Sequence, residues 1–342
     1  MSGARTWIVV TTINPPTAAI GHISALCARG WSAVVVGDTK TPADWSSPGI
    51  DFLSVDRQRE LFGPFADALP YRHYCRKNLG YLYAISRGAE LILETDDDNI
   101  PYPAFGAETE REVAGRYVEH RGWVNVYRYF TDELIWPRGL PLDAIHDAVP
   151  AAREGRGYRC PVQQYLADSD PDVDAIYRLL FREPVTFRRE APVVLSAGAE
   201  VPFNSQNTLF FREAFPLLYL PCHVSFRMTD IWRSFVAQRV LWVHGFRLAF
   251  KQATVTQARN EHDLMKDFND EVVGYVENRR ISRILDEACA RLDPADKATL
   301  AATAQALWAA LHAGGIVPDR ELPLVDGWFE ALRAATAAGG SP

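Results

Sequence analysis

An uninterrupted apolar run near the N-terminus sets the class of fold. Residues Trp7 to Thr12 are apolar or β-branched throughout, and the run ends at the breaker Asn14-Pro15-Pro16. A run without polar alternation is typical of a strand that is buried on both faces, as in a parallel sheet. The sequence therefore predicts an α/β protein.

The segment that follows completes a β-loop-α-β unit. Thr17 can cap a helix that ends at Gly30, and Ala33 to Val36 form a second strand. Short connections of this kind give a right-handed crossover, so a nucleotide crevice is expected at the carboxyl ends of the strands. The residues expected to contact the nucleotide at these ends are Thr11, Thr12 and Asp38. The last of these could equally cap the turn that follows it.

Three successive aspartates follow another buried strand. A helix from about Cys75 to Arg87 leads into the strand Glu90 to Thr95, and Asp96, Asp97 and Asp98 stand at its exit. Like charges this close repel one another unless a cation compensates them, and Mn²⁺ or Mg²⁺ prefers carboxylate oxygens. We predict that Asp96 and Asp98 bind the metal and that Asp97 contacts the nucleotide or sugar. The alternatives are a solvated acidic loop or aspartates that cap a helix.

Two further groups are candidates for ligand binding. Arg76, Lys77 and Asn78 begin a helix, where two cations and an amide beside free N–H groups suit a phosphate or the edge of a base. The alternative is a surface turn. His262 is a candidate third metal ligand because neutral imidazole suits Mn²⁺, whereas a lone histidine is more often structural.

Asp230 and Arg138 are the candidate catalytic residues. Asp230 lies in Phe-Arg-Met-Thr-Asp-Ile-Trp-Arg at the start of a predicted helix, so an ordinary N-cap is the competing interpretation. Arg138 lies in Trp-Pro-Arg-Gly-Leu-Pro, where proline and glycine hold a loop in a defined shape. Its alternative is an ordinary surface arginine.

The length of the chain suits one large domain with an appendage. For these 342 residues we expect a nucleotide-sugar-binding domain over residues 1–275 and a helical extension over residues 276–342. The stretch from Pro101 to about Gly198 has weak hydrophobic periodicity, which predicts loops and short elements around a site. The C-terminal helices either cover the core or pair subunits, which leaves a homo-oligomer possible.

Charge and cysteine content exclude several classes of protein. The net charge of −7 argues against a nucleic-acid partner, because phosphate backbones require concentrated Lys and Arg. The five cysteines are scattered without a C-x-x-C pair, so neither a disulfide framework nor a zinc site is expected. The sequence has no signal-peptide pattern and no apolar run near the roughly 20 residues of a spanning helix. We therefore expect a cytoplasmic protein without a membrane partner.

Several long strings occur in a fixed order along the chain. They are Trp7-Ile-Val-Val-Thr-Thr-Ile-Asn, Val35-Val-Gly-Asp-Thr-Lys-Thr-Pro, Arg76-Lys-Asn-Leu-Gly-Tyr-Leu-Tyr-Ala-Ile, Glu94-Thr-Asp-Asp-Asp-Asn, Asp170-Pro-Asp-Val-Asp-Ala-Ile-Tyr-Arg-Leu, Asn204-Ser-Gln-Asn-Thr, Asp230-Ile-Trp-Arg-Ser and Lys266-Asp-Phe-Asn-Asp-Glu. Together they resemble the STELLO glycosyltransferase-like family over roughly residues 6 to 275.

That family is related to the plant reversibly glycosylated polypeptides, which act as metal-dependent UDP-arabinose pyranose/furanose mutases and carry an acidic triplet. Arg138-Gly-Leu-Pro looks like their Arg-Gly-x-Pro segment. The plant mutases have a further arginine shortly after it, whereas this chain has Ile145 and His146 there. Sugar transfer to an arginine is therefore not expected.

The resemblance implies a GT-A-like fold with a mixed central sheet, a nucleotide-diphosphate sugar as ligand, and Mn²⁺ or Mg²⁺ without flavin or NAD. The chain also resembles soluble bacterial GDP-glucose pyranose/furanose mutases. The leading hypothesis is a mutase that interconverts the ring forms of a GDP- or UDP-activated hexose. The alternatives are a glycosyltransferase that uses a separate acceptor, and a binding protein whose metal site is vestigial.

Overall fold

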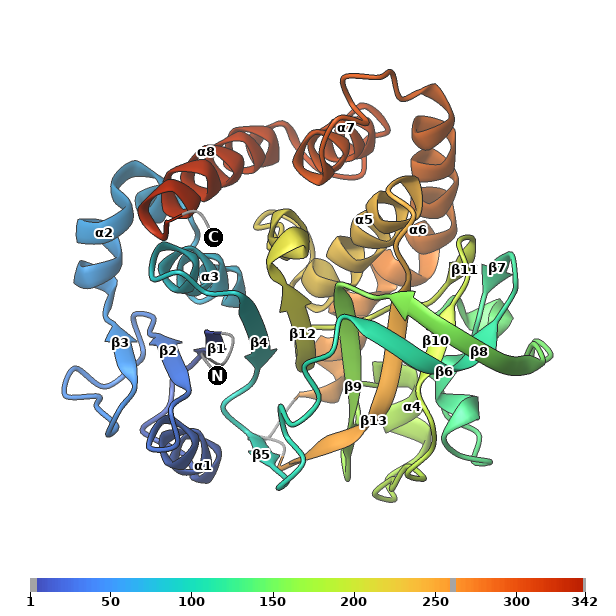
Figure 1. Cartoon of the computed structure of the whole chain (residues 1–342), viewed down its shortest axis with the longest axis horizontal. Helices are drawn as coiled ribbons and strands as arrows, with labels where there is room; N and C mark the ends of the chain where they lie inside the picture. The colour runs from blue at the N-terminus through green and yellow to red at the C-terminus, as the bar shows by residue number, and fades with distance from the viewer. Residues whose placement is uncertain (1–4, 259–262, 341–342) are drawn as a thin grey trace.

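The N-terminal β-loop-α-β unit forms as expected. In this computed structural model, which describes residues 5–258 and 263–340, β1 (Thr6–Thr11), α1 (Ala18–Cys27) and β2 (Ser32–Val36) follow one another, with β1 and β2 parallel (Figure 1). Thr17 caps α1, because its hydroxyl oxygen accepts the backbone N–H of Ile20 at 3.3 Å. The local signals of this segment therefore determine its structure.

A mixed sheet runs through the molecule. The other strands are β3 (Asp51–Leu53), β4 (Leu91–Thr95), β5 (Asn99–Pro101), β6 (Glu112–Val118), β7 (Gly122–Trp123), β8 (Ala152–Arg159), β9 (Val162–Asp168), β10 (Val193–Leu195), β11 (Ala199–Glu200), β12 (Asn207–Phe211) and β13 (Leu248–Gln257). Within the described residues the main sheet has 11 strands in the order β3-β2-β1-β4-β12-β9-β13-β10-β6-β8, and β5 pairs with β13. The first four strands are parallel, whereas β12 is antiparallel to both β4 and β9. The α/β fold with a mixed central sheet, as expected for the GT-A type, is confirmed.

The segment from Pro101 to Gly198 contains more regular structure than its weak periodicity suggests. Its strand β9 lies between β12 and β13, and all seven of its residues are buried. The sequence does not reveal that this strand is buried, because it contains two glutamines and glutamine is usually exposed. In the structure Gln163 donates hydrogen bonds to the backbone carbonyls of Glu110 and Cys160, at 2.7 and 3.1 Å. Backbone acceptors thus allow a polar side chain in a central strand.

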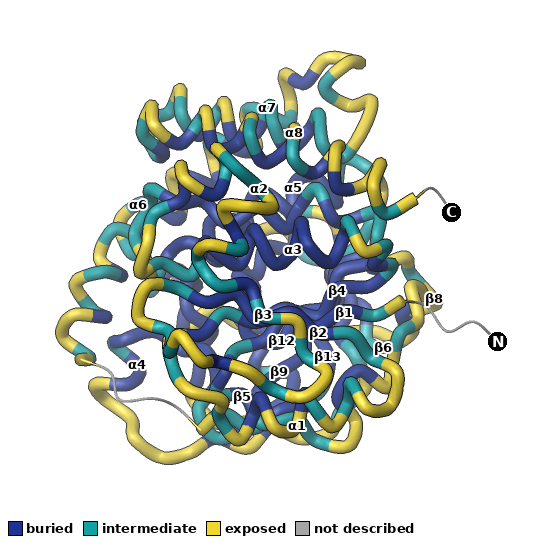
Figure 2. Tube along the Cα trace, turned by 90° about the vertical axis from the view of Figure 1, so that its left-hand side faces the viewer, coloured by how far each residue is buried: buried dark blue, intermediate teal, exposed yellow. Residues whose placement is uncertain are grey.

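Helices cover both faces of the sheet (Figure 1). Besides α1 they are α2 (Val55–Ala68), α3 (Lys77–Ser86), α4 (Ala175–Leu180), α5 (Thr229–Val243), α6 (Leu264–Arg291), α7 (Leu300–Ala313) and α8 (Leu322–Ala338), with short 3-10 helices at Tyr74–Arg76, Val126–Tyr129, Leu142–Ala144, Arg212–Leu218, Phe226–Met228 and Asp319–Glu321. On one face Ile8 and Val10 pack with residues of α1, and on the other Val9 packs with residues of α3. Figure 2 shows α3 as a buried layer between the sheet and α8. The strand ends that carry the candidate site are therefore held rigidly.

The C-terminal helices complete the core. Trp308 of α7 and Trp328 of α8 are fully buried, and both rings contact Tyr219. The boundary expected at residue 275 falls inside α6, which continues without a break from Leu264 to Arg291. A division into residues 1–275 and 276–342 stays a prediction. In the described part of the chain, no helix combines the length and the apolar character needed to cross a membrane.

Candidate functional site

Two adjoining pockets open at the carboxyl ends of β1, β2 and β4. The first has a cavity volume of about 240 Å³ and contains the three successive aspartates; we refer to it as the acidic pocket. The second has a volume of about 480 Å³ and lies against the ends of β1 and β2; we refer to it as the β1–β2 pocket. The residues that line both are Thr11, Tyr74, Asp97 and Phe226. A single elongated ligand could therefore occupy the two pockets together.

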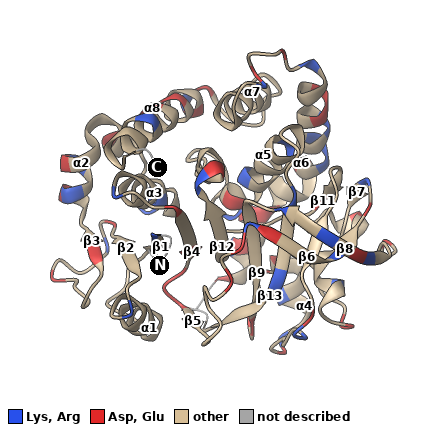
Figure 3. Cartoon of the chain, viewed as in Figure 1, with Lys and Arg blue, Asp and Glu red and all other residues tan. Residues whose placement is uncertain are grey.

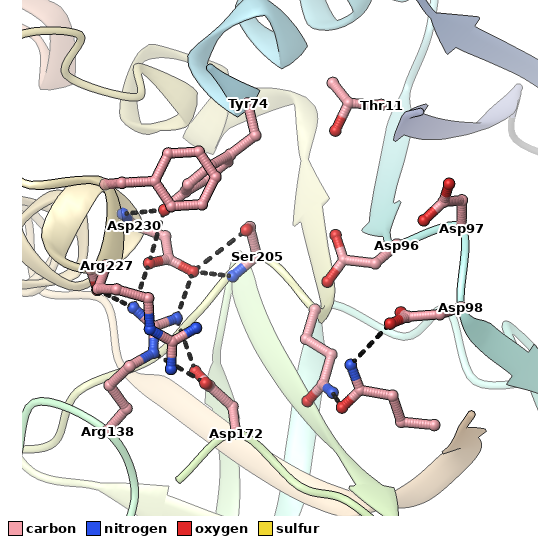
Figure 4. A pocket seen from close by; sticks show the side chains of 13 residues that line it. Thr11, Tyr74, Asp96, Asp97, Asp98, Arg138, Asp172, Ser205, Arg227 and Asp230 are labelled. Atoms are coloured by element: carbon pink, nitrogen blue, oxygen red, sulfur yellow. Dashed lines mark hydrogen bonds and ion pairs between the residues drawn. The ribbon is translucent and has the colours of Figure 1, made fainter. Parts of the chain in front are cut away.

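The three successive aspartates differ in their exposure to solvent. Asp96 and Asp98 are partly exposed and line the acidic pocket, whereas the Asp97 side chain is buried (Figure 4). The Asp97 carboxylate accepts the hydroxyl of Thr12 at 2.5 Å and the side-chain amide of Asn14 at 3.1 Å. Asp97 thus ties the loop after β1 to the end of β4. Figure 3 shows the acidic segment between β4 and β5.

The ammonium of Lys77 compensates the negative charge of Asp96. It donates to the Asp96 carboxylate and to the Thr95 carbonyl, each at 3.0 Å, and to the Ser205 carbonyl at 3.4 Å. Burial raises the pKa of Asp96, and the nearby ammonium opposes this effect. Since an ammonium has three N–H donors, Lys77 has none left for a ligand.

Asp98 is held by a residue of β13. The side-chain amide of Gln257, at the end of β13, donates to the Asp98 carboxylate at 3.2 Å. Among the residues that the structure describes, no three His, Cys, Asp or Glu side chains gather closely enough to surround a metal ion. His262, the predicted third ligand, lies outside the described residues.

Arg76, Lys77 and Asn78 all have protein partners in the structure, and their expected role in ligand binding stays a prediction. The Asn78 amide exchanges two hydrogen bonds of 2.9 Å with the backbone of Leu220, and neither Asn78 nor Lys77 lines a pocket described above. The reason is that α3 is buried between the sheet and α8, so polar residues at its start must find protein partners. The surface-turn alternative is wrong, because all three residues are buried.

Arg76 keeps an indirect role in the β1–β2 pocket. The acceptors of its four hydrogen bonds are uncharged: the side-chain oxygen of Gln58 and the backbone carbonyls of Ala66 and Leu69. Burial lowers the pKa of this guanidinium. It therefore places a buried positive charge behind the pocket, to which the exposed residues Lys40 and Arg72 add two more.

Asp38 caps backbone N–H groups. Its carboxylate accepts from the backbone of Thr39 and of Arg72, each at 2.6 Å, and from that of His73 at 3.3 Å. The turn-capping alternative therefore describes this side chain correctly. Asp38 still lines the β1–β2 pocket together with Thr12, so contact with a ligand there stays a prediction.

Arg138, Asp230 and Asp172 form one buried ionic network on the opposite side of the acidic pocket from Asp96 and Asp98 (Figure 4). The guanidinium donates to both oxygens of Asp172 at 2.8 and 2.9 Å and to both oxygens of Asp230 at 3.0 Å. Its remaining N–H bonds the backbone carbonyl of Arg227. All five N–H donors of Arg138 are therefore used inside the protein.

Asp230 is the second carboxylate that is paired with Arg138 in this network. Burial by itself would raise the pKa of Asp230, but the charge and hydrogen bonds of Arg138 outweigh burial, and its pKa is lowered. The carboxylate also accepts the backbone N–H and the hydroxyl of Ser205, at 3.0 and 3.1 Å, and the Tyr74 hydroxyl at 3.0 Å. The N-cap of α5 is Met228, so the simple capping role considered for Asp230 is wrong.

The sequence-based prediction of the site did not include seven residues that line the acidic pocket: Tyr74, Asp172, Ser205, Gln206, Phe226, Arg227 and Gln257. Asp172 lies in Asp-Pro-Asp-Val-Asp, and Ser205 and Gln206 lie in Asn-Ser-Gln-Asn, two of the strings that carry the family resemblance. That resemblance was the available signal. Their side-chain types alone pointed to no particular chemistry.

Comparison with known proteins shows similarity to one family. A family model described as STELLO glycosyltransferases matches residues 227–309, which include Asp230. "Probable glycosyltransferase STELLO2" from Arabidopsis thaliana is 34% identical over 270 residues, which are 73% of this chain and 35% of the plant protein. The chain is similar to the STELLO glycosyltransferases over this stretch. "Probable glycosyltransferase STELLO1" from the same plant is 34% identical over 260 residues, or 70% of this chain and 34% of that one. The chain thus spans about a third of the length of these relatives.

Solved structures with a similar arrangement are more distant. Glucosyl-3-phosphoglycerate synthase from Mycobacterium tuberculosis, bound to phosphoglyceric acid, has a TM-score of 0.41 and 13% identity, covering 86% of this chain and 83% of that one. A mycobacterial protein has a TM-score of 0.43 and 11% identity, covering 86% of this chain and 77% of its own.

Proposed function

We propose that this chain binds a nucleotide-diphosphate sugar across the two pockets and catalyses departure of the diphosphate from the anomeric carbon. The observation that carries the proposal is the arrangement at the strand ends. Asp96 and Asp98 line one side of the acidic pocket, the network of Arg138 lines the other, and the β1–β2 pocket adjoins both. This position at the carboxyl ends of parallel strands is where α/β proteins bind nucleotides.

The donor set suits a hard divalent cation. Asp96 and Asp98 line the pocket with their carboxylates, and the Asp96 side chain is 37% exposed. Oxygen ligands of this kind are preferred by Mn²⁺ and Mg²⁺. With such an ion bound, the site would gain positive charge that stabilises a leaving diphosphate. His262 stays a proposed third ligand, and no flavin or NAD is part of the proposal.

The protein's own charges favour one direction of binding. Arg76, Lys40 and Arg72 make the β1–β2 pocket the more positive of the two, which suits the nucleotide and its phosphates. Phe226 is 40% exposed where the pockets meet, and its ring contacts that of Tyr74 at a centroid distance of 4.8 Å. These aromatic groups offer an apolar surface to a base or a sugar ring.

We propose ring isomerisation of the sugar, a pyranose/furanose mutase reaction, as the finer function. A transferase that activates an acceptor hydroxyl with a carboxylate base needs a base that can take up a proton. Asp230 is unsuited to that task, because its carboxylate is hydrogen-bonded on both oxygens and its pKa is lowered. Asp230 and Arg138 instead form a rigid wall beside the sugar.

Sugar transfer to a separate acceptor is the second candidate, since both plant relatives carry the name probable glycosyltransferase. A thermal-shift screen of the whole chain with Mn²⁺ or Mg²⁺ against GDP-, UDP- and dTDP-sugars tests donor binding, and NMR with Mg²⁺ follows the sugar. A furanose anomeric signal that grows without acceptor supports the mutase. Binding without isomerisation directs the search to an acceptor, and absence of any metal-dependent nucleotide binding refutes the proposed function.

A further inference from the structure

The wall of the acidic pocket opposite Asp96 carries net negative charge. Two carboxylates, Asp172 and Asp230, share the single guanidinium of Arg138, so the three side chains together have a charge of about −1 at neutral pH. Their side chains are almost entirely buried, which reduces screening by water. An anionic group brought against this wall would be repelled.

Arg138 offers such a group no hydrogen bond. Four of its five N–H donors bond the two carboxylates and the fifth bonds the backbone carbonyl of Arg227. To bind a carboxylate or phosphate of a ligand, the guanidinium would have to abandon Asp172 or Asp230, leaving a buried charge unpaired. The N–H donors of Arg138 therefore bond protein groups and not the ligand.

The other cation in the lining is also paired. Arg227 contacts the carboxylate of Glu271 through Nε at 2.9 Å and Nη2 at 2.8 Å, and Glu271 is fully buried. The ammonium of Lys77, behind Asp96, is paired with the Asp96 carboxylate. Among the described residues, each cation in or directly behind this pocket is thus matched by a carboxylate.

Two neutral amides add to the polar surface of the pocket. The Gln257 amide donates to Asp98, and its side-chain oxygen accepts the Gln206 amide at 2.7 Å. The Asp98 carboxylate can only accept hydrogen bonds, so Gln257 must direct its N–H group toward Asp98 and its side-chain oxygen toward the N–H group of Gln206. The side-chain oxygen of Gln206 is then the last acceptor in this series of hydrogen bonds. An amide oxygen in the lining suits a sugar hydroxyl.

We propose that the acidic pocket selects an uncharged, hydroxyl-bearing sugar and rejects sugars that carry a carboxylate or a phosphate. The inference deepens the proposed function and rests on it, since it assumes that the nucleotide lies in the more positive β1–β2 pocket. The substrate class is then a nucleotide-activated neutral sugar, as opposed to a nucleotide-activated uronic acid.

Two matched pairs of donors test this selectivity in the wild-type chain. UDP-glucose is compared with UDP-glucuronic acid, and GDP-mannose with GDP-mannuronic acid, by calorimetric titration in Mg²⁺, with free UDP and GDP alongside. Each pair differs only in the group at C6. We expect the uronic acid of the pair with the preferred base to bind at least about tenfold more weakly than its neutral partner.

The outcomes separate the inference from the proposed function. Equal binding within a pair overturns the inference while the proposed function stands. If neither nucleotides nor donors bind, the proposed function falls and this inference falls with it. Weaker binding of the uronic acid supports both.

A charge variant tests the cause. Asp172→Asn removes one negative charge from the wall, so the difference between the neutral and the acidic donor should shrink at least about threefold. Asp143→Asn is the matched control, because Asp143 is exposed and pairs with Arg279 on the surface; it should leave the difference unchanged. Thermal unfolding establishes that each variant is folded. An unchanged difference in folded Asp172→Asn would overturn the electrostatic explanation.

Discussion

Arg138 and Asp230 lie 92 positions apart in the sequence and meet through two parallel hydrogen bonds of 3.0 Å. The pair connects the loop before the Leu142–Ala144 3-10 helix to the first turn of α5. A bidentate arrangement of this kind fixes orientation as well as distance. The shape of the acidic pocket therefore depends on an ion pair that joins two distant parts of the chain.

Replacing Arg138 should destabilise the fold strongly. Arg138→Ala would leave the buried carboxylates of Asp172 and Asp230 without their cation, at a cost of about 3–5 kcal/mol in the free energy of unfolding. Arg138→Lys should recover only part of the loss, because three N–H donors cannot replace five. Urea unfolding measures both. Arg279→Ala removes an exposed arginine that pairs with Asp143 and should change stability by less than about 1 kcal/mol; equal losses for Arg138→Ala and Arg279→Ala would contradict the prediction.

Asp96 and Asp98 should be needed for metal-dependent nucleotide binding. With ligand at about 100 times its Kd, the wild-type chain should gain about 2.7 kcal/mol of stability from Mn²⁺ and nucleotide together. Asp96→Asn and Asp98→Asn should each lose most of this gain, because an amide lacks the negative charge of the ligand it replaces. The readout is the thermal shift with and without EDTA. A full shift in either variant would remove that residue from the set of metal ligands, and Asp143→Asn serves as the control.

Asp174 should make folding stability depend on pH. Burial raises the pKa of Asp174 to about 6, in spite of hydrogen bonds from Tyr177 and Trp136. The folded state thus holds this proton more tightly than the unfolded state, where the pKa is about 3.9. The stabilisation is fully present below about pH 4 and is lost as the pH rises through about 6, by at most about 3 kcal/mol.

The variant Asp174→Asn isolates this effect, because its amide does not titrate. Urea unfolding of both proteins between pH 4 and pH 7 should show wild-type stability falling relative to the variant as the pH rises. The comparison cancels the titration of groups that the two proteins share. A constant difference between them across this range would count against the raised pKa.

Close packing of α3 on the sheet gives a prediction that is independent of the site. A methyl group on Gly80 would lie 2.6 Å from a methyl group of Val9 and 2.8 Å from one of Val36. Gly80→Ala should therefore cost about 1–3 kcal/mol through overpacking, as measured by urea unfolding. Gly21→Ala in α1 is the matched control, since apart from its chain neighbours and the backbone of its own helix no atom lies within 4 Å of the added carbon. It should stabilise the protein by up to about 1 kcal/mol, and the same sign for both would refute the packing argument.

Sequence patterns correctly predicted the features that are determined by local interactions. The apolar run of β1, the cap at Thr17 and the acidic triplet after β4 all depend on neighbouring residues, and the structure places them as expected. The strand β9 was missed because its glutamines are satisfied by distant backbone carbonyls. Hydrophobic periodicity carries no information about such partners.

Sequence patterns were enough to predict the α/β class, the strand ends that would form a crevice, and the aspartates that would stand at one of them. Which charged side chains remain available to a ligand became clear from the folded structure alone. Arg76, Lys77 and Arg138 appeared as ligand-binding or catalytic residues in the sequence, yet their N–H donors are directed at protein acceptors. The physical reason is that burial makes hydrogen-bonding partners obligatory, and those partners are supplied by segments that are far away in the chain.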